Sequence, residues 1–159
     1  MSVGYRKNKI IVPISVSLTL LLIGCNDNKA SQCQRLIKTV NDGNSLVEIN
    51  KGTQVATSLK LAKDLQTATK KIEQLNLKDP KLKEYQTQFV KVFTTLSQNI
   101  YKAGKALNTA KLAKASTSGR QQIQTARSEI DNALKAAEVA AKQSDVLATQ
   151  VNRYCSQPE

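Results

Sequence analysis

The stretch that decides the fold runs from Ile123 to Cys155 and reads IQTARSEIDNALKAAEVAAKQSDVLATQVNRYC. Apolar and small residues recur in it at steps of three and four, which is the spacing of the contact face of a coiled-coil helix. This stripe consists of Ile123, Ala126, Ile130, Ala133, Ala137, Ala140, Ser144, Leu147, Val151 and Tyr154. The spacing predicts one long helix at the end of the chain.

A second stripe with the same spacing precedes the first. It consists of Leu82, Tyr85, Phe89, Val92, Leu96, Ile100, Ala103, Leu107 and Ala110. Asp79 and Pro80 stand in front of it as an N-cap and a first-turn proline. The break between the two stripes is Ser116-Thr117-Ser118-Gly119. The sequence therefore predicts an antiparallel hairpin of two long helices.

Two shorter helical patterns lie upstream. The second of them, marked by Leu59, Ala62, Leu65, Ala68, Ile72 and Leu75, would start at the N-cap candidate Thr53 and end near Asn76. The first is marked by Cys33, Leu36, Ile37, Val40 and Val47 and would run from about Ala30, with Lys51-Gly52 as a C-cap. Gly43 is a weak spot within it. The pattern leaves open whether the chain turns at Gly52 or continues as one long helix.

The first 24 residues have the composition of a signal sequence. Arg6, Lys7 and Lys9 supply positive charge, and an apolar run follows from Ile10 to Ile23. This run is shorter than the roughly 20 residues that a membrane-spanning helix needs. It ends in Leu22-Ile23-Gly24-Cys25, which resembles the lipobox of bacterial lipoproteins.

The resemblance implies that the chain is cut before Cys25 and that acyl chains are attached to this residue. Two or three acyl chains hold a protein stably on a membrane. The expected organisation is a lipoprotein signal peptide (1–24), a lipidated tether (25–29), a helical bundle (30–155) and a short tail (156–159). The expected location is the outer face of the cell membrane or the outer membrane. An ordinary signal peptide followed by a chance cysteine is the alternative.

Lipidation of Cys25 leaves two cysteines, Cys33 and Cys155, in a compartment where thiols are usually oxidised. A disulfide between them is the simplest expectation, and two unpaired buried thiols are the alternative. Consecutive antiparallel helices bring the two ends of the chain together only when their number is even. The disulfide thus favours an all-α antiparallel bundle of four helices over a three-helix version. The longer last pair should then project beyond the first pair as a coiled-coil hairpin, by on the order of 20 Å.

The amino-acid composition argues against catalysis and metal binding. The chain has no histidine, which is the side chain that titrates near neutral pH and the commonest zinc ligand. Glu129 and Asp131 are two residues apart, so on a helix they point in opposite directions and cannot act together as acid and base. We therefore expect no enzymatic activity, no cofactor and no metal. Tyr85, Phe89, Phe93 and Tyr101 are expected in the core, with an apolar ligand pocket as the alternative.

The charge pattern is more informative, because the net charge is +12 and no acidic residue occurs between Tyr85 and Ser128. Six basic residues, Lys102, Lys105, Lys111, Lys114, Arg120 and Arg127, fall on the expected projecting arm. They form either an ordinary solvated face or a contact for an anionic lipid, an acidic envelope polymer or an acidic protein. Nucleic acid is not expected in this compartment.

The lysine-rich helical body and the late Tyr154-Cys155 resemble small helical lipoproteins of cyanobacterial type, a resemblance that implies no defined activity. The expected function is a noncatalytic structural or protein-interaction role in the cell envelope. The alternative is a ligand-binding or accessory subunit of an envelope complex that contacts anionic surfaces through the basic arm.

Overall fold

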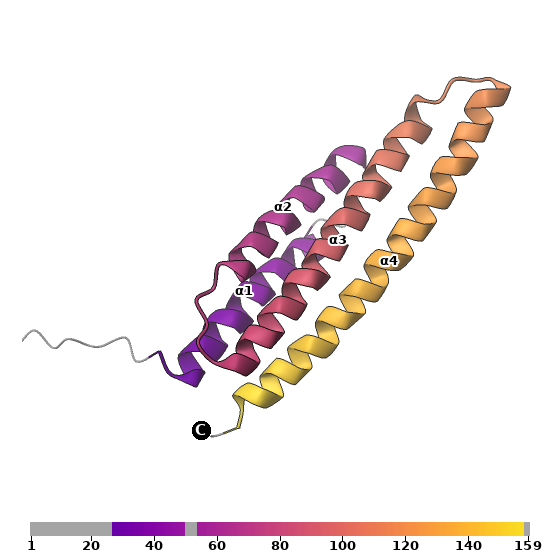
Figure 1. The fold of residues 1–159 in the computed structure, drawn as a ribbon. Coiled ribbons are helices and arrows are strands. Elements are labelled where there is room, and N and C mark those ends of the chain that lie inside the picture. The colour runs from indigo at the N-terminus through magenta and orange to yellow at the C-terminus, as the bar shows by residue number, and fades with distance from the viewer. Residues whose placement is uncertain (1–26, 50–53, 158–159) are drawn as a thin grey trace, which may run out of the picture.

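The computed structural model describes residues 27–49 and 54–157, and these form four α-helices with no strand among them. The helices are α1 (Lys29–Ile49), α2 (Val55–Glu73), α3 (Pro80–Leu112) and α4 (Thr117–Cys155). Figure 1 shows them side by side, each antiparallel to the next along the chain. The predicted all-α bundle of four helices is confirmed, and the first two helices are separate.

The core is built around α3. This helix packs against each of the other three, whereas α2 and α4 do not contact each other over the described residues. The largest fully buried side chains are Phe89, Phe93, Leu36, Leu65, Ile72, Leu82, Val40, Val92 and Val151. Farther toward the tip of the hairpin the buried positions are small, with Ala103, Ala106, Ala126 and Ala133 between α3 and α4. The two long helices can therefore approach each other closely there.

A disulfide joins the two ends of the described chain. Cys33, in the second turn of α1, is bonded to Cys155, the last residue of α4, with 5.9 Å between their Cα atoms. The predicted pair is confirmed. The bond closes a loop with a sequence separation of 122 residues. On the chain-entropy model a loop of this size stabilises the folded state by roughly 4 to 5 kcal/mol.

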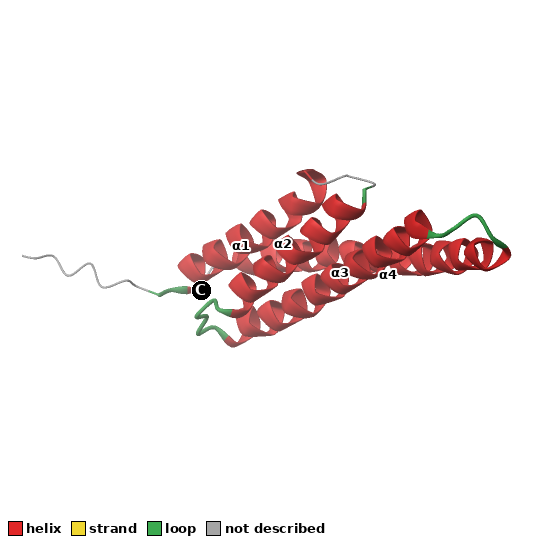
Figure 2. Cartoon of the chain, turned by 90° about the horizontal axis from the view of Figure 1, so that it is seen from above, coloured by secondary structure: helices red, strands yellow, loops and turns green. Residues whose placement is uncertain are grey.

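The hairpin of α3 and α4 projects beyond both short helices, as Figure 2 shows. The Ser144 hydroxyl donates to the side-chain oxygen of Asn44 at 3.3 Å, which places Ile49, at the end of α1, near the level of Val139. From Thr117 to Val139, α4 thus extends about 33 Å beyond α1 at 1.5 Å per residue. The hairpin projects less far beyond α2, because Gly104 of α3 lies against Leu59 near the start of α2, whereas α1 ends nearer the base.

The helix ends follow the predicted caps with two differences. The Asp79 carboxylate accepts from the backbone N–H of Leu82 at 2.8 Å, with Pro80 in the first turn, as predicted. The expected break at Ser116–Gly119 is wrong: the break is 113–116, and Thr117 already begins α4. The reason is that the Ser116 hydroxyl accepts from the N–H of Gly119 and so acts as the N-cap. At α2 the N-cap is Gln54, and the expected cap Thr53 lies outside the described residues, as does Lys51-Gly52.

Part of the predicted stripe on α4 is not in the core. Ile123 is 44% exposed and Ile130 is half-buried, whereas the alanines between them and beyond them are buried. The physical reason is the length of α1, which ends below this part of the hairpin, so that none of the described helices covers that side of α4.

Gly43 is a contact point rather than a weak spot. A methyl group at this position would overlap the edge of the Phe93 ring, with Cζ at 2.8 Å, and would also contact Ala68 of α2. Because Phe93 is fully buried, its ring has no free space into which to move. The absence of a side chain at Gly43 therefore lets α1 lie directly on α3.

We predict that Gly43→Ala lowers the free energy of unfolding by about 1 to 3 kcal/mol, the usual effect of overpacking a core. Helix propensity alone would favour alanine over glycine by about 1 kcal/mol. Asn41→Ala, at an exposed position of the same helix, is the control and should change stability little. Denaturant unfolding of both variants measures the difference, and a Gly43→Ala variant at least as stable as the parent would contradict the close contact.

Candidate functional site

The predicted lipidation site, Cys25, lies outside the described residues, and Asp27 is the first residue that the structure describes. The start of α1 lies at the same end of the bundle as the C-terminal end of α4 (Figure 1), and Asp27 contacts Gln32 and Arg35 of α1 at this end. This end, which also holds the disulfide, is called the base below. The opposite end, where α3 turns into α4, is the tip.

Ionic and polar contacts hold Asp27 to the base. Its carboxylate lies 2.6 Å from the Arg35 guanidinium and 3.6 Å from the Lys78 ammonium. The hydrogen bond and charge of Arg35, together with Lys78, hold the pKa of the Asp27 carboxyl below its usual value. The Gln32 amide donates to the backbone oxygen of Asp27 at 2.7 Å. The chain is therefore bound to the bundle two residues after Cys25.

The same glutamine ties α1 to the loop between α2 and α3. The side-chain oxygen of Gln32, which is 3% exposed, accepts from the backbone N–H groups of Lys78 and Asp79 at 2.6 and 2.9 Å. Gln86 of α3 donates to the backbone oxygens of Ile72 and Leu75 at 2.8 and 2.9 Å and so satisfies the end of α2. The roles of both glutamines could not be predicted from the sequence, because a single polar residue that bonds to a distant backbone leaves no periodic signal.

Asp79 links the base to the end of α4. Its carboxylate accepts from the Tyr154 hydroxyl at 2.8 Å, and the Lys29 ammonium lies 4.4 Å from the centre of the Tyr154 ring. Burial alone would raise the pKa of Asp79, but the hydrogen bonds from the Leu82 N–H and from Tyr154 outweigh it, so the pKa is lowered. Asp79 is therefore both an N-cap and a partner of the C-terminal turn.

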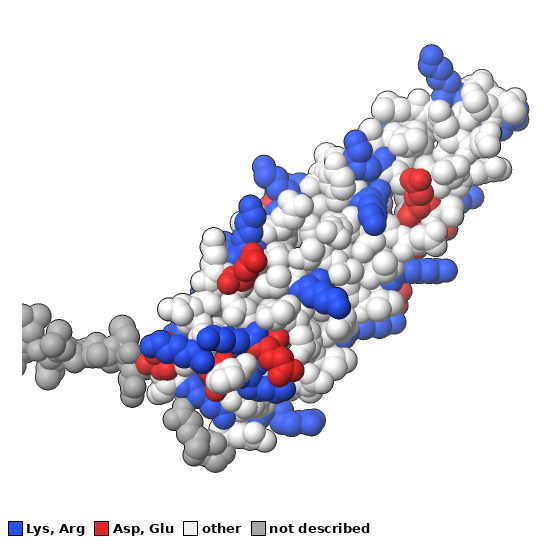
Figure 3. Space-filling view, viewed as in Figure 1, with Lys and Arg blue, Asp and Glu red and all other residues white. Residues whose placement is uncertain are grey.

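Four of the six predicted basic residues, Lys111, Lys114, Arg120 and Arg127, lie on the part of the hairpin that projects beyond both short helices. The other two, Lys102 and Lys105, flank Gly104, which lies against Ser58 and Leu59, so they lie beside the first turns of α2. Lys102, Lys105 and Lys111 lie on α3, Lys114 on the turn, and Arg120 and Arg127 on α4, and all six side chains are exposed. Among the described residues none of the six forms an ion pair, and the six pairs found lie elsewhere in the bundle. In Figure 3, acidic and basic side chains are intermixed near the base, whereas the tip carries basic ones.

The aromatic residues divide between core and surface. Tyr85, Phe89 and Phe93 are buried, as expected for a core, and the Tyr85 ring lies 6.2 Å from that of Tyr154. Tyr101 is 49% exposed, so the expectation that it is in the core is wrong. Its ring lines a surface groove between α3 and α4 with Lys102 and Glu129, instead of packing between the helices.

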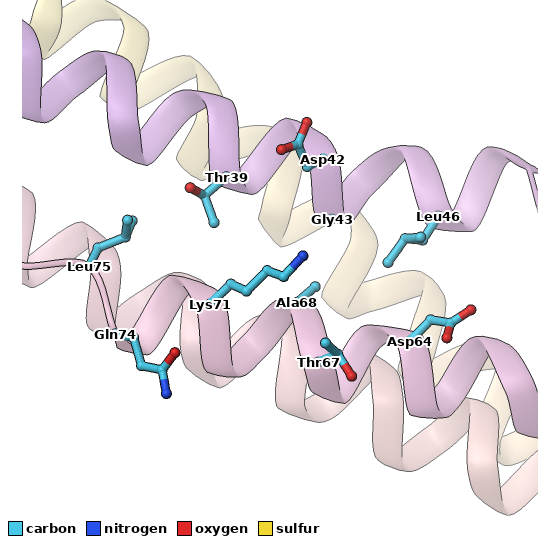
Figure 4. Close-up of a pocket in the computed structure, with 10 residues that line it drawn as sticks. All are labelled: Thr39, Asp42, Gly43, Leu46, Asp64, Thr67, Ala68, Lys71, Gln74 and Leu75. Atoms are coloured by element: carbon cyan, nitrogen blue, oxygen red, sulfur yellow. The ribbon is translucent and has the colours of Figure 1, made fainter.

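A groove of about 620 Å³ runs between α1 and α2 (Figure 4), with Gly43 and Ala68 among its lining residues. Its polar groups mostly bond within their own helices. The hydroxyls of Thr39 and Thr67 donate to backbone oxygens one turn earlier, and Asp64 pairs with Lys60 at 2.6 Å. Figure 4 shows the Lys71 side chain directed between the two helices. The groove therefore has one ammonium group and two carboxylates on its walls, without a set of groups that converge on one point.

Two further observations concern chemistry and membranes. Within residues 27–49 and 54–157, no three Cys, Asp or Glu side chains gather where they could hold a metal ion. None of the four described helices combines the length and the apolar character that crossing a bilayer requires.

Comparison with known proteins adds no relative: no protein-family model, curated protein or solved structure matches this chain.

The lowered pKa values of Asp27 and Asp79 predict that the protein loses stability in acid. A carboxyl whose pKa is lowered in the folded state contributes stability that is present above its unfolded pKa of about 4 and is lost as the pH falls through the folded value. We predict that the free energy of unfolding falls below about pH 4. Asp79→Ala should cost about 1 kcal/mol at pH 7, the usual value of an N-cap, and flatten part of the acid dependence.

The control is Asp131→Asn, which changes an exposed carboxylate without a described partner and should alter stability at pH 7 by little. Thermal or denaturant unfolding between pH 2 and pH 7 measures both. If the two substitutions changed the free energy of unfolding equally, the contacts of Asp79 would not contribute to the stability of the bundle.

Proposed function

We propose that this protein is a lipoprotein, anchored through Cys25 outside the cytoplasmic compartment, whose bundle has a noncatalytic role in binding other components of the cell envelope. The observation that carries the proposal is the separation of two ends: Asp27, two residues after Cys25, is fixed to the base, and the basic residues gather toward the tip. One end is thus suited to attachment and the other to contact.

The contacts of Asp27 support a short tether. Only Asn26 stands between Cys25 and Asp27, and Asp27 is paired with Arg35 and Lys78 at the base. With lipid on Cys25, the base would stand directly at the membrane. α4 has 39 residues, so its tip would stand about 60 Å away when the bundle is upright.

This distance favours a partner other than the headgroups of the anchoring membrane. The Debye length at physiological ionic strength is about 8 Å, so an upright tip would not sense that membrane's charge. An acidic protein or an acidic envelope polymer remains within reach of the tip. Lipid headgroups would be reached only by a molecule that lies flat, which is the alternative arrangement.

The distribution of charge supports an electrostatic contact. Six basic side chains without a described ion pair lie on the half of the hairpin nearer the tip, where most of the buried positions are alanine. Opposed charges steer a partner to such a surface and make its association sensitive to salt. An accessory role in a larger envelope complex, the second candidate, rests on the same basic residues.

For the anchor, we predict that Cys25→Ser abolishes lipid attachment and releases the protein from the membrane fraction, since the thiol that would carry the lipid is gone. The double variant Cys33→Ser with Cys155→Ser is the control, because it keeps Cys25 and should remain membrane-bound. Cell fractionation with a high-salt wash measures the distribution. A Cys25→Ser variant that is still cut before residue 25 and stays membrane-bound would show that lipid is not the anchor.

For the hairpin, we predict that the chain lacking residues 1–25 binds acidic envelope polymer at low salt and releases it as salt rises. Replacing Lys111, Lys114 and Arg120 with Gln should weaken this binding without lowering thermal stability, because exposed charges contribute little to folding.

Lys63, Lys70 and Lys83, which are exposed on α2 and near the start of α3, provide the control when changed to Gln, because they alter the net charge equally. Co-sedimentation over a salt series measures both triple variants. If the two weaken binding equally, net charge rather than the hairpin carries it, and if neither does, the basic residues are only a solvated face.

A further inference from the structure

One side of α4 changes character along its length. Residues seven apart share a helix face, and two such series on α4 face α1. The first is Cys155, Ala148, Ala141, Leu134, Arg127 and Arg120, and the second is Val151, Ser144, Ala137, Ile130 and Ile123. Near the base, Cys155 is bonded to Cys33, Ser144 bonds to Asn44, and Ala148 lines a small cleft with α1 residues.

Apart from Val151, the residues of these series are small where α1 covers them, and beyond Ala137 they are large. Ala141, Ser144 and Ala148 lie beside α1, which ends near the level of Val139. Beyond that level come Leu134, which is 47% exposed, then Ile130 and Ile123. Solvent-facing helix positions normally carry polar residues, so large aliphatic residues here indicate a surface that another element covers.

α3 continues the same surface. Phe93, which lies against Gly43 of α1, is followed at intervals of seven by Ile100 and Leu107, both half-buried. These two residues and Ile123, Ile130 and Leu134 of α4 together form what we call the uncovered face. It extends the line of α1 along the hairpin toward the tip.

Positive charge lies on this same face. Arg120 and Arg127 occupy the series of Leu134, one and two steps nearer the tip, and both are exposed without an ion pair among the described residues. Of the nearby acidic residues, Glu129 lines a groove on the other side of the hairpin with Asn99 and Lys102, and Asp131 is exposed. The uncovered face therefore combines aliphatic side chains with guanidinium groups.

We propose that the uncovered face binds an acidic amphipathic helix of a partner protein, which lies in line with α1 along the hairpin. The apolar side of such a helix covers Ile123, Ile130 and Leu134, and its carboxylates pair with Arg120 and Arg127. The proposal rests on the interaction role proposed above and specifies its partner. About 33 Å of α4 lies beyond α1, which is the length of a helix of about three heptads.

A second copy of this chain fits the face less well, because two hairpins would bring arginines of like charge together. A flat membrane also fits less well. α1 stands on the same face, and packed helix axes are about 8 to 10 Å apart, so a plane resting on α1 is held away from Leu134. A helix placed in line with α1 can contact Leu134, because it occupies the same place on the hairpin that α1 occupies nearer the base.

The test uses the full chain in nanodiscs of neutral lipid, with empty nanodiscs as the blank, and a fluorescent peptide of three heptads. The peptide carries Leu at the first and fourth heptad positions and mostly Glu elsewhere. We expect saturable binding by fluorescence anisotropy. A peptide with Lys in place of Glu, and one of the same composition in scrambled order, should each bind at least tenfold more weakly.

Matched protein variants locate the binding. Ile123→Gln with Leu134→Gln should weaken it at least tenfold, and Arg120→Gln with Arg127→Gln should weaken it and reduce its salt dependence. Val139→Gln with Val146→Gln is the control, because these valines are 66% and 57% exposed on another side of α4, and it should change binding less than twofold. The four apolar residues replaced in these variants, at positions 123, 134, 139 and 146, are all on the surface. Thermal unfolding checks that each variant folds.

Absence of peptide binding, or equal loss with both apolar variants, would overturn the proposal. Two other results would also overturn the proposal. If the protein binds anionic vesicles and Ile123→Gln with Leu134→Gln abolishes this binding, the face is a membrane contact. If the protein self-associates in sedimentation and the same variant abolishes it, the face binds a second copy. If one of these results is obtained but the hairpin still binds acidic polymer, the proposed function remains supported and only the helical partner is ruled out.

Discussion

The bond between Cys33 and Cys155 is the constraint on which the bundle depends. α1 is short, and its buried residues are few: Gln32, Cys33, Leu36, Val40 and Gly43. The disulfide holds the start of this helix beside the end of α4, and the contacts of Gln32 and Asp27 then fix the loop before α3 around the same point. One end of the molecule is thereby closed covalently and by hydrogen bonds, whereas the other end consists of two helices alone. The asymmetry between base and tip follows from this arrangement.

That asymmetry is repeated in the chemistry of the side chains. Large aromatic rings fill the core where α1, α2 and α4 surround α3, and alanines replace them toward the tip, beyond the end of α1. Acidic residues become rare on the same segment, and its surface carries large aliphatic residues and cations that form no ion pair with another described residue. Small buried residues give a two-helix segment little apolar area, so the disulfide and the core near the base must hold the hairpin in place. The tip can then vary its surface for binding without loss of the core.

Much of the fold could be predicted from the sequence, because long helices with regular stripes, an Asp-Pro start and two remaining cysteines constrain the topology strongly. The four helices, the projecting hairpin and the disulfide are confirmed on that basis. The side of α4 that α1 covers could not be predicted, since a stripe with steps of three and four looks the same whether a neighbour is present or ends short. For this reason the predicted contact stripe includes Ile123 and Ile130, although they lie beyond α1 and are exposed and half-buried, respectively. The role of Gly43 was equally hidden, because its significance depends on the Phe93 ring of another helix.

The most direct test of this arrangement is non-reducing peptide mapping of protein taken from its native compartment with free thiols blocked at lysis. Trypsin should release residues 30–35, which contain Cys33, linked to residues 154–159, which contain Cys155. A dominant linked species that separates on reduction is the predicted result. Blocked free thiols on both cysteines would contradict a covalently closed base, and with it the main physical reason for an even number of helices.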